Sequence, residues 1–517
     1  MKINPFLATD GYKTGHHKMY PKGTTLVYSN FTPRHGKHSN TDLGGVISFG
    51  QQMTIRQIYN MFNENFFNEP IHKVCGEIKK EYSMYLAEDY DVSHIEDLHA
   101  LGFLPIKVKA VPEGTFVPYG VPVLTIVNTK PEFFWLTNFL ETLISNMLWM
   151  PMTSATTAYA FKKVLTKWAL KTDKENVGFV DFQGHNFGMR GMGGLDATIY
   201  SGMGHSTSFK GDDSLPTIAA AREYYDEKDF VVGSVNATEH SVMCAGGDKD
   251  ELGTFRYLMN QFPKGILSIV SDTWNLWDVL TKFLPELKEE ILARDGKIVI
   301  RPDSGDPVDI ICGVIVNGNN ADGEPMHDLN QDINNPKWQV ITVPESKGVI
   351  ELLWDVFGGT TNEQGYKVLD PHIGAIYGDS ITIARAEEIC ARLEAKGFAS
   401  TNVVLGIGSF TYQFVTRDTH GFAMKATYVE IKELDKERGS YGTIKGREIF
   451  KDPITDDGGK KSAKGLLTVI DQGENGGLTL YDQAAWEAED KGVLQTIYHD
   501  ELFFNKVTLT EIRERLS

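Results

Sequence analysis

Residues 297–307 read Lys-Ile-Val-Ile-Arg-Pro-Asp-Ser-Gly-Asp-Pro, a short apolar run followed at once by charged and turn-forming residues. Its apolar run, Ile298–Ile300, is β-branched at every position, which is typical of a strand buried on both faces in a parallel sheet or barrel. Pro302 lacks an N–H group and ends the strand. Arg301 and Asp303 then stand at the carboxyl end of the strand, where α/β folds bind their ligands.

The pair Arg301 and Asp303 has two interpretations. The rigid, permanently charged fork of an arginine suits phosphate oxygens, and a carboxylate suits Mg²⁺ or a sugar hydroxyl. A structural ion pair that closes the loop would use the same two residue types. The binding interpretation gains weight because a similar arrangement recurs at other strand ends of the chain.

Residues 151–420 alternate short apolar runs with helical patterns, such as Leu276–Ala293 and Ile383–Lys396. Several runs lie about 30 residues apart, which is the spacing of βαβ units. A polar insertion at 317–335 is predicted to be a surface loop. We therefore predict that residues 151–420 form an irregular α/β barrel. The predicted strands are Val177–Phe182, Val231–Val235, Ile266–Val270, Ile298–Ile300, Ile373–Tyr377 and Val403–Leu405.

The two ends of the chain have a different pattern. Residues 104–128 alternate like a small antiparallel β unit, and Phe134–Met150 is predicted to be a buried helix that Pro151 ends. Residues 466–481 are again β-like. We predict a second, β-rich domain built from residues 1–150 and 421–517.

Composition limits the classes of function. A chain of 517 residues can form two or more domains, and its net charge of −18 argues against a nucleic-acid or anionic-membrane partner. We find neither a signal peptide nor an apolar span long enough for a membrane helix. The four cysteines are far apart and form no CxxC pair, so we expect them to be reduced in a cytoplasmic protein.

Polar and glycine residues follow each predicted strand of the barrel. Because the carboxyl ends of parallel strands share one rim, we expect these residues to converge on one pocket for a phosphorylated sugar or nucleotide. Basic residues after Asp418 either reach a polyphosphate or belong to a solvated loop. The segments at the strand ends are His185–Gly191, Asn236–Ser241, Ser271–Thr273, Arg301–Asp303, Gly378–Ser380 and Gly406–Ser409.

A set of short segments along the chain matches one known family in order and spacing: Leu7–Lys13, Lys109–Gly114, Trp135–Asn138, Phe187–Gly191, Phe209–Gly211, Glu239–Ser241, Ile300–Gly305, Gly378–Asp379, Thr416–Asp418 and Phe450–Pro453. By these segments the chain resembles the nicotinamide phosphoribosyltransferase family along nearly its whole length, and residues 151–420 would be its phosphoribosyltransferase domain. The resemblance implies a homodimer with shared active sites that makes nicotinamide mononucleotide and pyrophosphate from nicotinamide and phosphoribosyl pyrophosphate in NAD salvage. It also implies Mg²⁺, and ATP as a co-substrate that phosphorylates the histidine matching His240.

The resemblance assigns roles to residues of this chain. Phe187 and Tyr12, the latter from the other subunit, would stack on the two faces of the nicotinamide ring, and Asp213 would accept a hydrogen bond from its amide. The residues expected to hold the pyrophosphate are Arg190, His240 and Arg301, with Asp303 near the ribose. Those expected to hold the ribose and its 5′-phosphate are Gly378, Asp379, Ser409 and Arg417, the last across the subunit interface. Further phosphate contacts are expected from Arg34, Lys425, Lys451 and Lys460.

Three positions depart from the family pattern. Asn186 and Asn275 stand where the family has Asp, and Ser409 replaces a Gly. The loss of two carboxylates is expected to weaken the orientation of His240 or the binding of Mg²⁺, whose ligands the sequence does not identify. Two rival functions stay open: a nicotinate phosphoribosyltransferase of the same fold, which the charge of Asp213 disfavours, and an inactive nucleotide-binding homologue.

Overall fold

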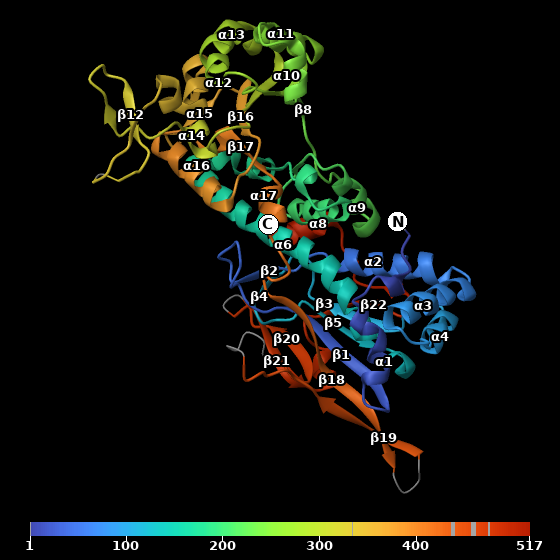
Figure 1. Cartoon of the computed structure of the whole chain (residues 1–517). Helices are drawn as coiled ribbons and strands as arrows, with labels where there is room; N and C mark the ends of the chain where they lie inside the picture. The colour runs from blue at the N-terminus through green and yellow to red at the C-terminus, as the bar shows by residue number, and fades with distance from the viewer. Residues whose placement is uncertain (1, 333, 436–439, 456–461, 474–475) are drawn as a thin grey trace.

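Two seven-stranded sheets, one parallel and one antiparallel, dominate the computed structural model of the chain (Figure 1). The structure describes residues 2–332, 334–435, 440–455, 462–473 and 476–517. Lys460 lies outside these residues, so the phosphate contact predicted for it stays a prediction.

The parallel sheet has the order β7-β6-β17-β16-β10-β9-β8, and every neighbouring pair in it is parallel. Its edges meet at an isolated bridge between Gly211 in β7 and Gly233, just before β8. The sheet is therefore a curled, irregular barrel, as predicted. Its strands are β6 (Gly184–Asn186), β7 (Gly211–Asp212), β8 (Asn236–Ala237), β9 (Lys264–Val270), β10 (Asp295–Arg301), β16 (Ile373–Tyr377) and β17 (Val403–Ile407).

Helices cover the barrel and bury its outward-facing residues. The strand predicted at Ile298–Ile300 is confirmed within β10. Ile298 and Ile300 are fully buried in this core, whereas Val299 on the other face is half-buried. The predicted helices Leu276–Ala293 and Ile383–Lys396 are also present, the first as three consecutive helical segments. The covering segments are α11 (Glu251–Gln261), α12 (Leu276–Asp278), η7 (Val279–Phe283), α13 (Leu284–Leu292), α14 (Pro307–Cys312), α15 (Val343–Phe357) and α16 (Ile383–Ala395).

Two predicted barrel strands were wrong. The run Val177–Phe182 is helical and precedes β6, because a short apolar run fits a helix that buries one side as well as it fits a strand. The run Val231–Val235 forms only the bridge at Gly233, and the carbonyl oxygen of Val231 accepts a hydrogen bond from Arg513 instead of from a neighbouring strand. The strand that follows is β8.

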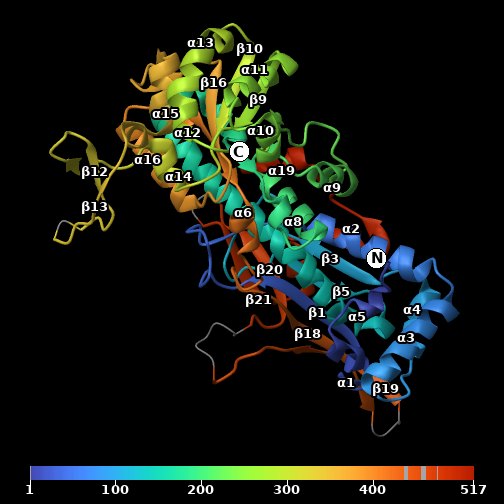
Figure 2. The same ribbon diagram turned by 45° about the horizontal axis from the view of Figure 1, so that its top comes forward.

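The polar insertion is not a loop throughout. Its segments β11 (Gly318–Asn319) and β12 (Pro325–Asp328) pair with β13 (Trp338–Val340) in a small antiparallel sheet. This sheet projects from the barrel at the left of Figures 1 and 2. The surface position was predicted correctly, whereas the strands were missed because the polar composition masks their alternation.

The antiparallel sheet has the order β19-β18-β1-β5-β3-β22-β23, and it contains the β unit predicted at 104–128. The late strands β20 and β21 pack on it, where Leu466 and Leu467 contact Tyr28. Its strands are β1 (Thr24–Pro33), β3 (Ile106–Ala110), β5 (Leu124–Asn128), β18 (Phe422–Asp435), β19 (Ser440–Glu448), β22 (Gln495–His499) and β23 (Leu502–Phe503); β2 (Gly45–Ile47) pairs with β4 (Phe116–Pro118), β20 (Leu466–Asp471) with β21 (Leu478–Ala484), and β14 (Gly359–Thr361) with β15 (Lys367–Leu369).

Helices also surround the antiparallel sheet and connect it to the barrel. The division into domains at residues 150 and 420 stays a prediction. The longer of these helices are α2 (Gln51–Phe62), α3 (Ile71–Leu86), α4 (Ser93–Leu101), α6 (Glu141–Thr172), α8 (Leu195–Ser206), α9 (Pro216–Tyr225) and α19 (Leu509–Leu516). The shorter ones are η1 (Pro5–Leu7), η2 (Gly11–Gly15), α1 (His16–Met19), η3 (Asn63–Phe67), η4 (Pro131–Phe133), α5 (Leu136–Phe139), η5 (Lys174–Phe179), α7 (Val180–Gln183), η6 (Met189–Gly191), α10 (His240–Gly246), η8 (Ser400–Asn402), α17 (Ser409–Gln413) and α18 (Trp486–Glu489).

The long helix α6 runs past Pro151, so the prediction that this proline ends the helix was wrong. A proline inside a helix costs about 3 kcal/mol, and packing on both sides of the residue offsets this cost. A Cβ at Gly50 would lie 2.8 Å from the Pro151 ring, and a Cβ at Gly204 of α8 would lie 2.6 Å from its carbonyl oxygen. Backbone at both glycines therefore fits closely against the proline.

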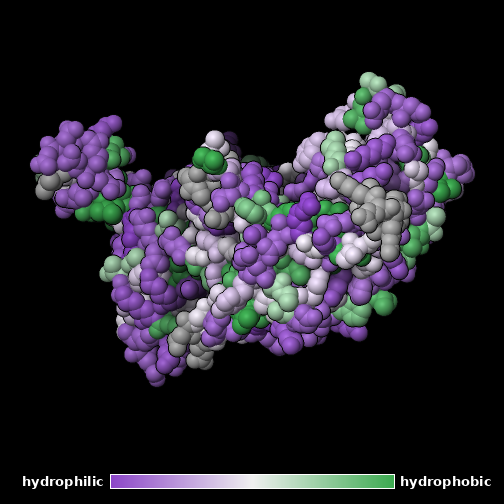
Figure 3. All heavy atoms as spheres, turned by 90° about the horizontal axis from the view of Figure 1, so that it is seen from below, coloured by the Kyte–Doolittle hydropathy of each residue, from purple (hydrophilic) through white to green (hydrophobic). Residues whose placement is uncertain are grey.

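The face of the molecule seen in Figure 3 is largely hydrophilic, with hydrophobic residues in small separate groups. Among the described residues, no helix has both the length and the apolar character that crossing a bilayer requires.

Candidate active site

The rim of the barrel brings Arg301 and Asp303 against the end of the next strand. The backbone N–H of Gly378 donates to the carbonyl oxygen of Pro302 over 3.1 Å. A Cβ at Gly378 would lie only 2.6 Å from Asp303 Oδ1, so a side chain at this position would displace the Asp303 carboxylate. Arg301 Nε is buried and has no hydrogen-bond partner among the described residues. A cation with an unused donor beside a carboxylate suits an oxyanion ligand.

Asp272 is a rim residue to which sequence reasoning gave no role. Its Oδ2 accepts hydrogen bonds from the backbone N–H of Asp303 (2.9 Å) and from the hydroxyl of Ser304 (2.5 Å). Its Oδ1 is buried without a partner among the described residues. The sequence does show that Asp272 follows the predicted strand Ile266–Val270. It does not show which groups the side chain contacts.

His240 is the first residue of α10 and is exposed at the same rim. Its Nε2 lies 3.8 Å from Asp303 Oδ2, and its Nδ1 lies 3.2 Å from the hydroxyl oxygen of Thr273. One ring nitrogen therefore faces a carboxylate and the other a hydroxyl. The structure thus brings together the predicted residues His240, Arg301 and Asp303.

A second part of the rim joins an aromatic ring to a carboxylate. Phe187 follows β6, and its ring centroid lies 4.6 Å from that of His185. His185 Nε2 donates to Asp213 Oδ1 over 2.8 Å, and the hydroxyl of Ser234 donates to the same oxygen. Burial raises the pKa of Asp213, but the hydrogen bonds from His185 and Ser234 and the positive charge of Arg301 outweigh it, so the pKa lies below its ordinary value.

The ends of β16 and β17 complete the rim between these two parts. A Cβ at Gly408 would lie 2.6 Å from Asp379 Oδ1, which places Asp379 beside the start of α17. A Cβ at Gly191 would lie 2.0 Å from Ser409 Oγ, so the loop with Arg190 passes directly over Ser409. Gly378, Asp379, Ser409 and the exposed Arg190 thus occupy one rim, as predicted from the strand ends.

The other predicted residues form a separate group on the antiparallel sheet, which we call the basic cluster (Arg34, Arg417, Lys425, Lys451). Burial lowers the pKa of Lys425, and the positive charges of Arg34, Lys451 and Arg417 add to this decrease against the opposing Glu141. Partial burial raises the pKa of Tyr12, Glu141 adds to the increase, and Arg417 opposes it. Tyr12 and the basic cluster are therefore neighbours.

Tyr12 and Phe187 do not face each other within one chain. The ring of Tyr12 contacts His16, and the ring of Phe187 contacts His185. Tyr12 is 65% exposed, although Lys13 beside it is buried and pairs with Glu141. The structure thus places the two predicted stacking residues in different groups of one subunit.

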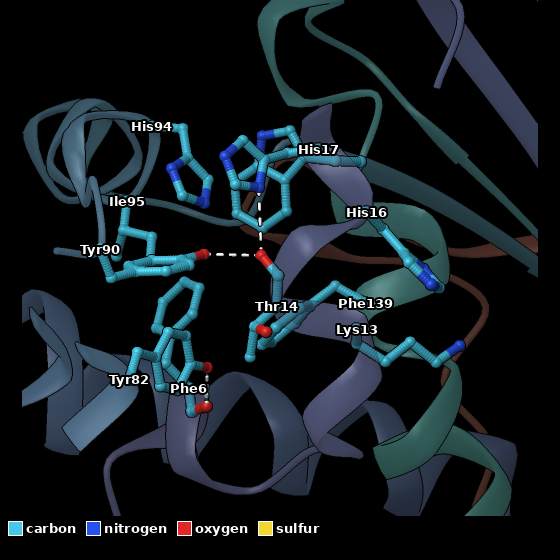
Figure 4. A pocket seen from close by; sticks show the side chains of 11 residues that line it. Phe6, Lys13, Thr14, His16, His17, Tyr82, Tyr90, His94, Ile95 and Phe139 are labelled. Atoms are coloured by element: carbon cyan, nitrogen blue, oxygen red, sulfur yellow. Dashed lines mark hydrogen bonds between the residues drawn. The ribbon is translucent and has the colours of Figure 1, made fainter. Parts of the chain in front are cut away.

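The segment that carries Tyr12 rests on a half-buried pair of histidines, His17 and His94. The carbonyl oxygen of Thr14 accepts hydrogen bonds from His17 Nδ1 (3.1 Å) and from the Tyr90 hydroxyl (2.6 Å), as Figure 4 shows. The rings of His17 and His94 stack with centroids 3.7 Å apart. The cavity beside them measures about 10 Å³, which is about the least space that can hold one water molecule.

Buried histidines are expected to make the fold sensitive to acid. Burial lowers the pKa of His94 and of His205 to about 3 and that of His420 to about 4. Below pH 6.5 these histidines become protonated in the unfolded chain but stay neutral in the folded chain, so the free energy of unfolding decreases as the pH falls. At pH 5 the decrease is about 2 kcal/mol for each fully buried histidine. Thermal unfolding from pH 7 to 5 measures it. His94→Phe should flatten the decrease in Tm, whereas replacement of the exposed His38 by Ala should not; equal slopes in all three proteins would contradict the expectation.

The two asparagines that depart from the family pattern have structural contacts. Asn186 donates to Asp212 Oδ1 (3.1 Å) and accepts from the backbone N–H of Gly188 (2.9 Å). Asn275 caps α12 by accepting from the N–H groups of Trp277 and Asp278. Neither asparagine hydrogen-bonds to His240. No direct contact therefore links either asparagine to the orientation of His240. The expected effect on Mg²⁺ binding stays a prediction.

Comparisons with known proteins agree with this geometry. The model of the nicotinate phosphoribosyltransferase family matches residues 182–501, and that of the N-terminal domain of nicotinamide phosphoribosyltransferase matches residues 4–108. The fold resembles the crystal structure of human nicotinic acid phosphoribosyltransferase, with a TM-score of 0.53 at 15% identity over 98% of this chain and 93% of that one. Fold, rim and family models define an enzyme of the phosphoribosyltransferase class.

Relatives narrow the class. A nicotinamide phosphoribosyltransferase of Acinetobacter baylyi is 46% identical over 100% of this chain and 97% of its own length. One of Mycoplasma pneumoniae is 33% identical over 88% of this chain and 93% of its own length. The chain belongs to the nicotinamide phosphoribosyltransferase family.

Proposed function

We propose that this enzyme makes nicotinamide mononucleotide and pyrophosphate from nicotinamide and phosphoribosyl pyrophosphate, in NAD salvage in the cytoplasm. The observation that carries the proposal is the rim itself. It joins an aromatic ring and a carboxylate suited to an aromatic amide, Phe187 and Asp213, to a group suited to pyrophosphate, His240, Arg301 and Asp303.

The residues suit an alignment mechanism. The pyridine nitrogen has a free lone pair and attacks ribose C1, while the bond from C1 to the pyrophosphate oxygen breaks and that oxygen keeps the electron pair. No base is needed, so the protein must hold both reactants in line and stabilise the charge on the leaving group. Arg301 and Arg190 would supply that charge, and the Asp303 carboxylate would stabilise the positive charge that develops on the ribose.

Mg²⁺ fits this rim as a companion of the pyrophosphate. Among the described residues no cluster of three or more acidic, histidine or cysteine side chains is arranged to hold a metal. Mg²⁺ commonly uses one or two carboxylates together with substrate phosphates, and Asp272, with one buried oxygen unpaired, and Asp303 are suitable donors. When bound, Mg²⁺ would neutralise charge on the leaving pyrophosphate.

ATP is proposed to act through His240. A ring nitrogen of His240 would attack the γ-phosphorus, the bond between that phosphorus and its bridging oxygen would break, and ADP would leave. Arg190 and Arg301 at the same rim would neutralise the transferred phosphoryl group. The contacts of His240 with Asp303 and Thr273 hold the ring at the rim where such a transfer must occur.

A homodimer with shared sites is proposed because one subunit separates Tyr12 and the basic cluster from the rim. A second copy would complete the site by placing its Tyr12 opposite Phe187. Two exposed rings beside the rim support such a contact: Phe410 is 49% and Phe414 is 79% exposed, and their centroids lie 5.0 Å apart. Exposed aromatic pairs of this kind are common at protein interfaces.

The proposal is tested by a product assay with phosphoribosyl pyrophosphate, Mg²⁺ and either nicotinamide or nicotinate. We expect nicotinamide mononucleotide as the main product, with formation of pyrophosphate in equal amount. Nicotinate mononucleotide as the main product would favour the rival function, a nicotinate phosphoribosyltransferase of the same fold. The family model that matches residues 182–501 bears the name of that activity. No product with either base would favour an inactive homologue.

Asp213 is expected to set the choice of base. Its Oδ1 is occupied by His185 and Ser234, and its Oδ2 accepts no hydrogen bond from the described residues, so this oxygen can accept from the amide. A nicotinate carboxylate would be repelled by it. Asp213→Asn should shift the ratio of kcat/KM toward nicotinate by about tenfold or more. Asp379→Asn, on the ribose side of the rim, serves as the control, and an unchanged ratio for Asp213→Asn would contradict the assignment.

A further inference from the structure

The C-terminal helix α19 lies against the seam of the barrel. Its residues Leu509 and Ile512 are fully buried, and a capping box between Thr508 and Glu511 begins it. Figure 2 shows α19 beside α9, and Figure 1 shows the end of the chain near α8. Thr510 donates from its backbone N–H and its hydroxyl to Glu227 Oε2, over 2.8 and 2.9 Å. The helix is therefore attached to the segment that leads from α9 to β8.

Within the part of the chain that the structure describes, Arg513 on this helix donates to backbone carbonyl oxygens alone. Nε donates to Ser206 over 2.7 Å, and the terminal nitrogens donate to Phe209 (3.4 Å), Phe230 (3.2 Å) and Val231 (2.5 Å). Burial lowers the pKa of Arg513 to about 10, against the opposing charges of Glu227 and Asp181, so the side chain is still charged at pH 7. One guanidinium thus connects the end of α8 to the segment before β8.

That segment closes the barrel and supplies a residue to the site. Gly233 N–H donates to Lys210 O (2.8 Å), and Asp212 N–H donates to Gly233 O (3.1 Å). These two bonds form an isolated bridge instead of a strand ladder. Ser234 comes next, and its hydroxyl donates to Asp213. The relative position of Ser234 and Asp213 therefore depends on how Phe230 and Val231 are held.

We infer that Arg513 is a positioning residue for recognition of the base: it fixes the 230–234 segment so that Ser234 orients the Asp213 carboxylate. The inference rests on the proposed function, since it requires Asp213 to contact the amide. The planar fork of arginine suits the task, because it can donate to four separate carbonyl oxygens in fixed directions. Lysine has the charge but not this geometry.

The test compares Arg513→Lys with a control on the same helix. Arg515 donates from one guanidinium nitrogen to the carbonyl oxygen of Glu113, away from the seam, so Arg515→Met perturbs the helix without releasing the 230–234 segment. We expect Arg513→Lys to raise the KM for nicotinamide about tenfold, with the KM for phosphoribosyl pyrophosphate and kcat changed less than about twofold. Arg515→Met should leave all three near the wild-type values.

A double variant separates positioning from stability. If Arg513 acts through Ser234, then Arg513→Lys combined with Ser234→Ala should raise the KM for nicotinamide no more than the stronger single variant does. If Arg513→Lys does not fold, Thr510→Val loosens the same segment at Glu227 and should give a smaller rise in the same KM. Equal rises in both KM values, or multiplied effects in the double variant, would overturn the inference while leaving the proposed function intact. A wild-type enzyme that forms no nicotinamide mononucleotide would overturn both.

Discussion

A mixture of Tyr12→Ala and Arg301→Ala proteins is expected to regain activity that neither protein has alone. Loss of Arg301 removes charge stabilisation at the rim and should lower kcat/KM by about 10²- to 10³-fold. Loss of Tyr12 leaves the nicotinamide ring stacked on one face only, and misplacement of this kind lowers the rate by about 10²-fold. If each site combines Tyr12 of one subunit with the rim of the other, a hybrid dimer contains one intact site. After full subunit exchange of a symmetric dimer, activity should reach about a quarter of the wild-type value.

The control for this experiment uses two rim variants. Arg301 and Asp303 belong to the same rim, so a mixture of Arg301→Ala and Asp303→Ala proteins should stay inactive, because every site in every dimer has one defect. Subunit exchange is followed by mass-labelled chains in both mixtures. If exchange is complete and the Tyr12→Ala mixture is no more active than its components, then Tyr12 acts within its own chain.

Replacement of His240 by alanine should abolish ATP hydrolysis while some synthesis of the mononucleotide continues. The phosphoryl acceptor is lost, but Arg301, Asp303 and the base-binding residues stay in place, so transfer proceeds without coupling. At low substrate concentrations we expect the added benefit of ATP to disappear. The measurement is incubation with γ-labelled ATP followed by acid and base treatment, because a phosphohistidine is labile in acid and stable in base.

His327 provides a matched control for the labelling. It lies on β12 of the projecting sheet, and its Nδ1 contacts the carbonyl oxygen of Ile315, away from the rim. The His327→Ala protein should be labelled like the wild type. Label of equal amount in the His240→Ala protein would remove the proposed role of His240 and leave ATP coupling without its acceptor.

Prediction from sequence succeeded where the pattern of apolar residues was compatible with only one type of secondary structure. The β-branched run Ile298–Ile300 has buried neighbours on both sides in the fold, and the residues after it could be assigned to a rim because parallel strands end together. The runs Val177–Phe182 and Val231–Val235 failed because apolar composition alone does not distinguish a strand from a buried helix or an irregular segment. Pro151 failed because the cost of an interior proline was offset by glycines 50 and 204, which are distant in the sequence.

The site shows the same division. Strand-end positions could be predicted, since they follow from topology, and the family resemblance supplied their roles. The contacts of Asp272 with Asp303 and Ser304 could not be predicted, because these residues follow two different strands and lie 31 and 32 positions from Asp272 in the sequence. The hydrogen bonds of Arg513 to the segment before β8 are still less accessible, since they join residues more than 280 positions apart and involve only backbone oxygens, which carry no sequence signal.

Helix α6 has a consequence for how the molecule responds to force and heat. Its 32 residues form a rod about 48 Å long at 1.5 Å per residue. Leu148 and Met152 near its middle belong to the core of the antiparallel sheet, whereas Phe161 and Leu165 belong to the core of the barrel. The helix is continuous through Pro151, so the two cores pack on a single element. The two sheets therefore share one helix. Unfolding of either sheet together with α6 would expose the core of the other sheet to water.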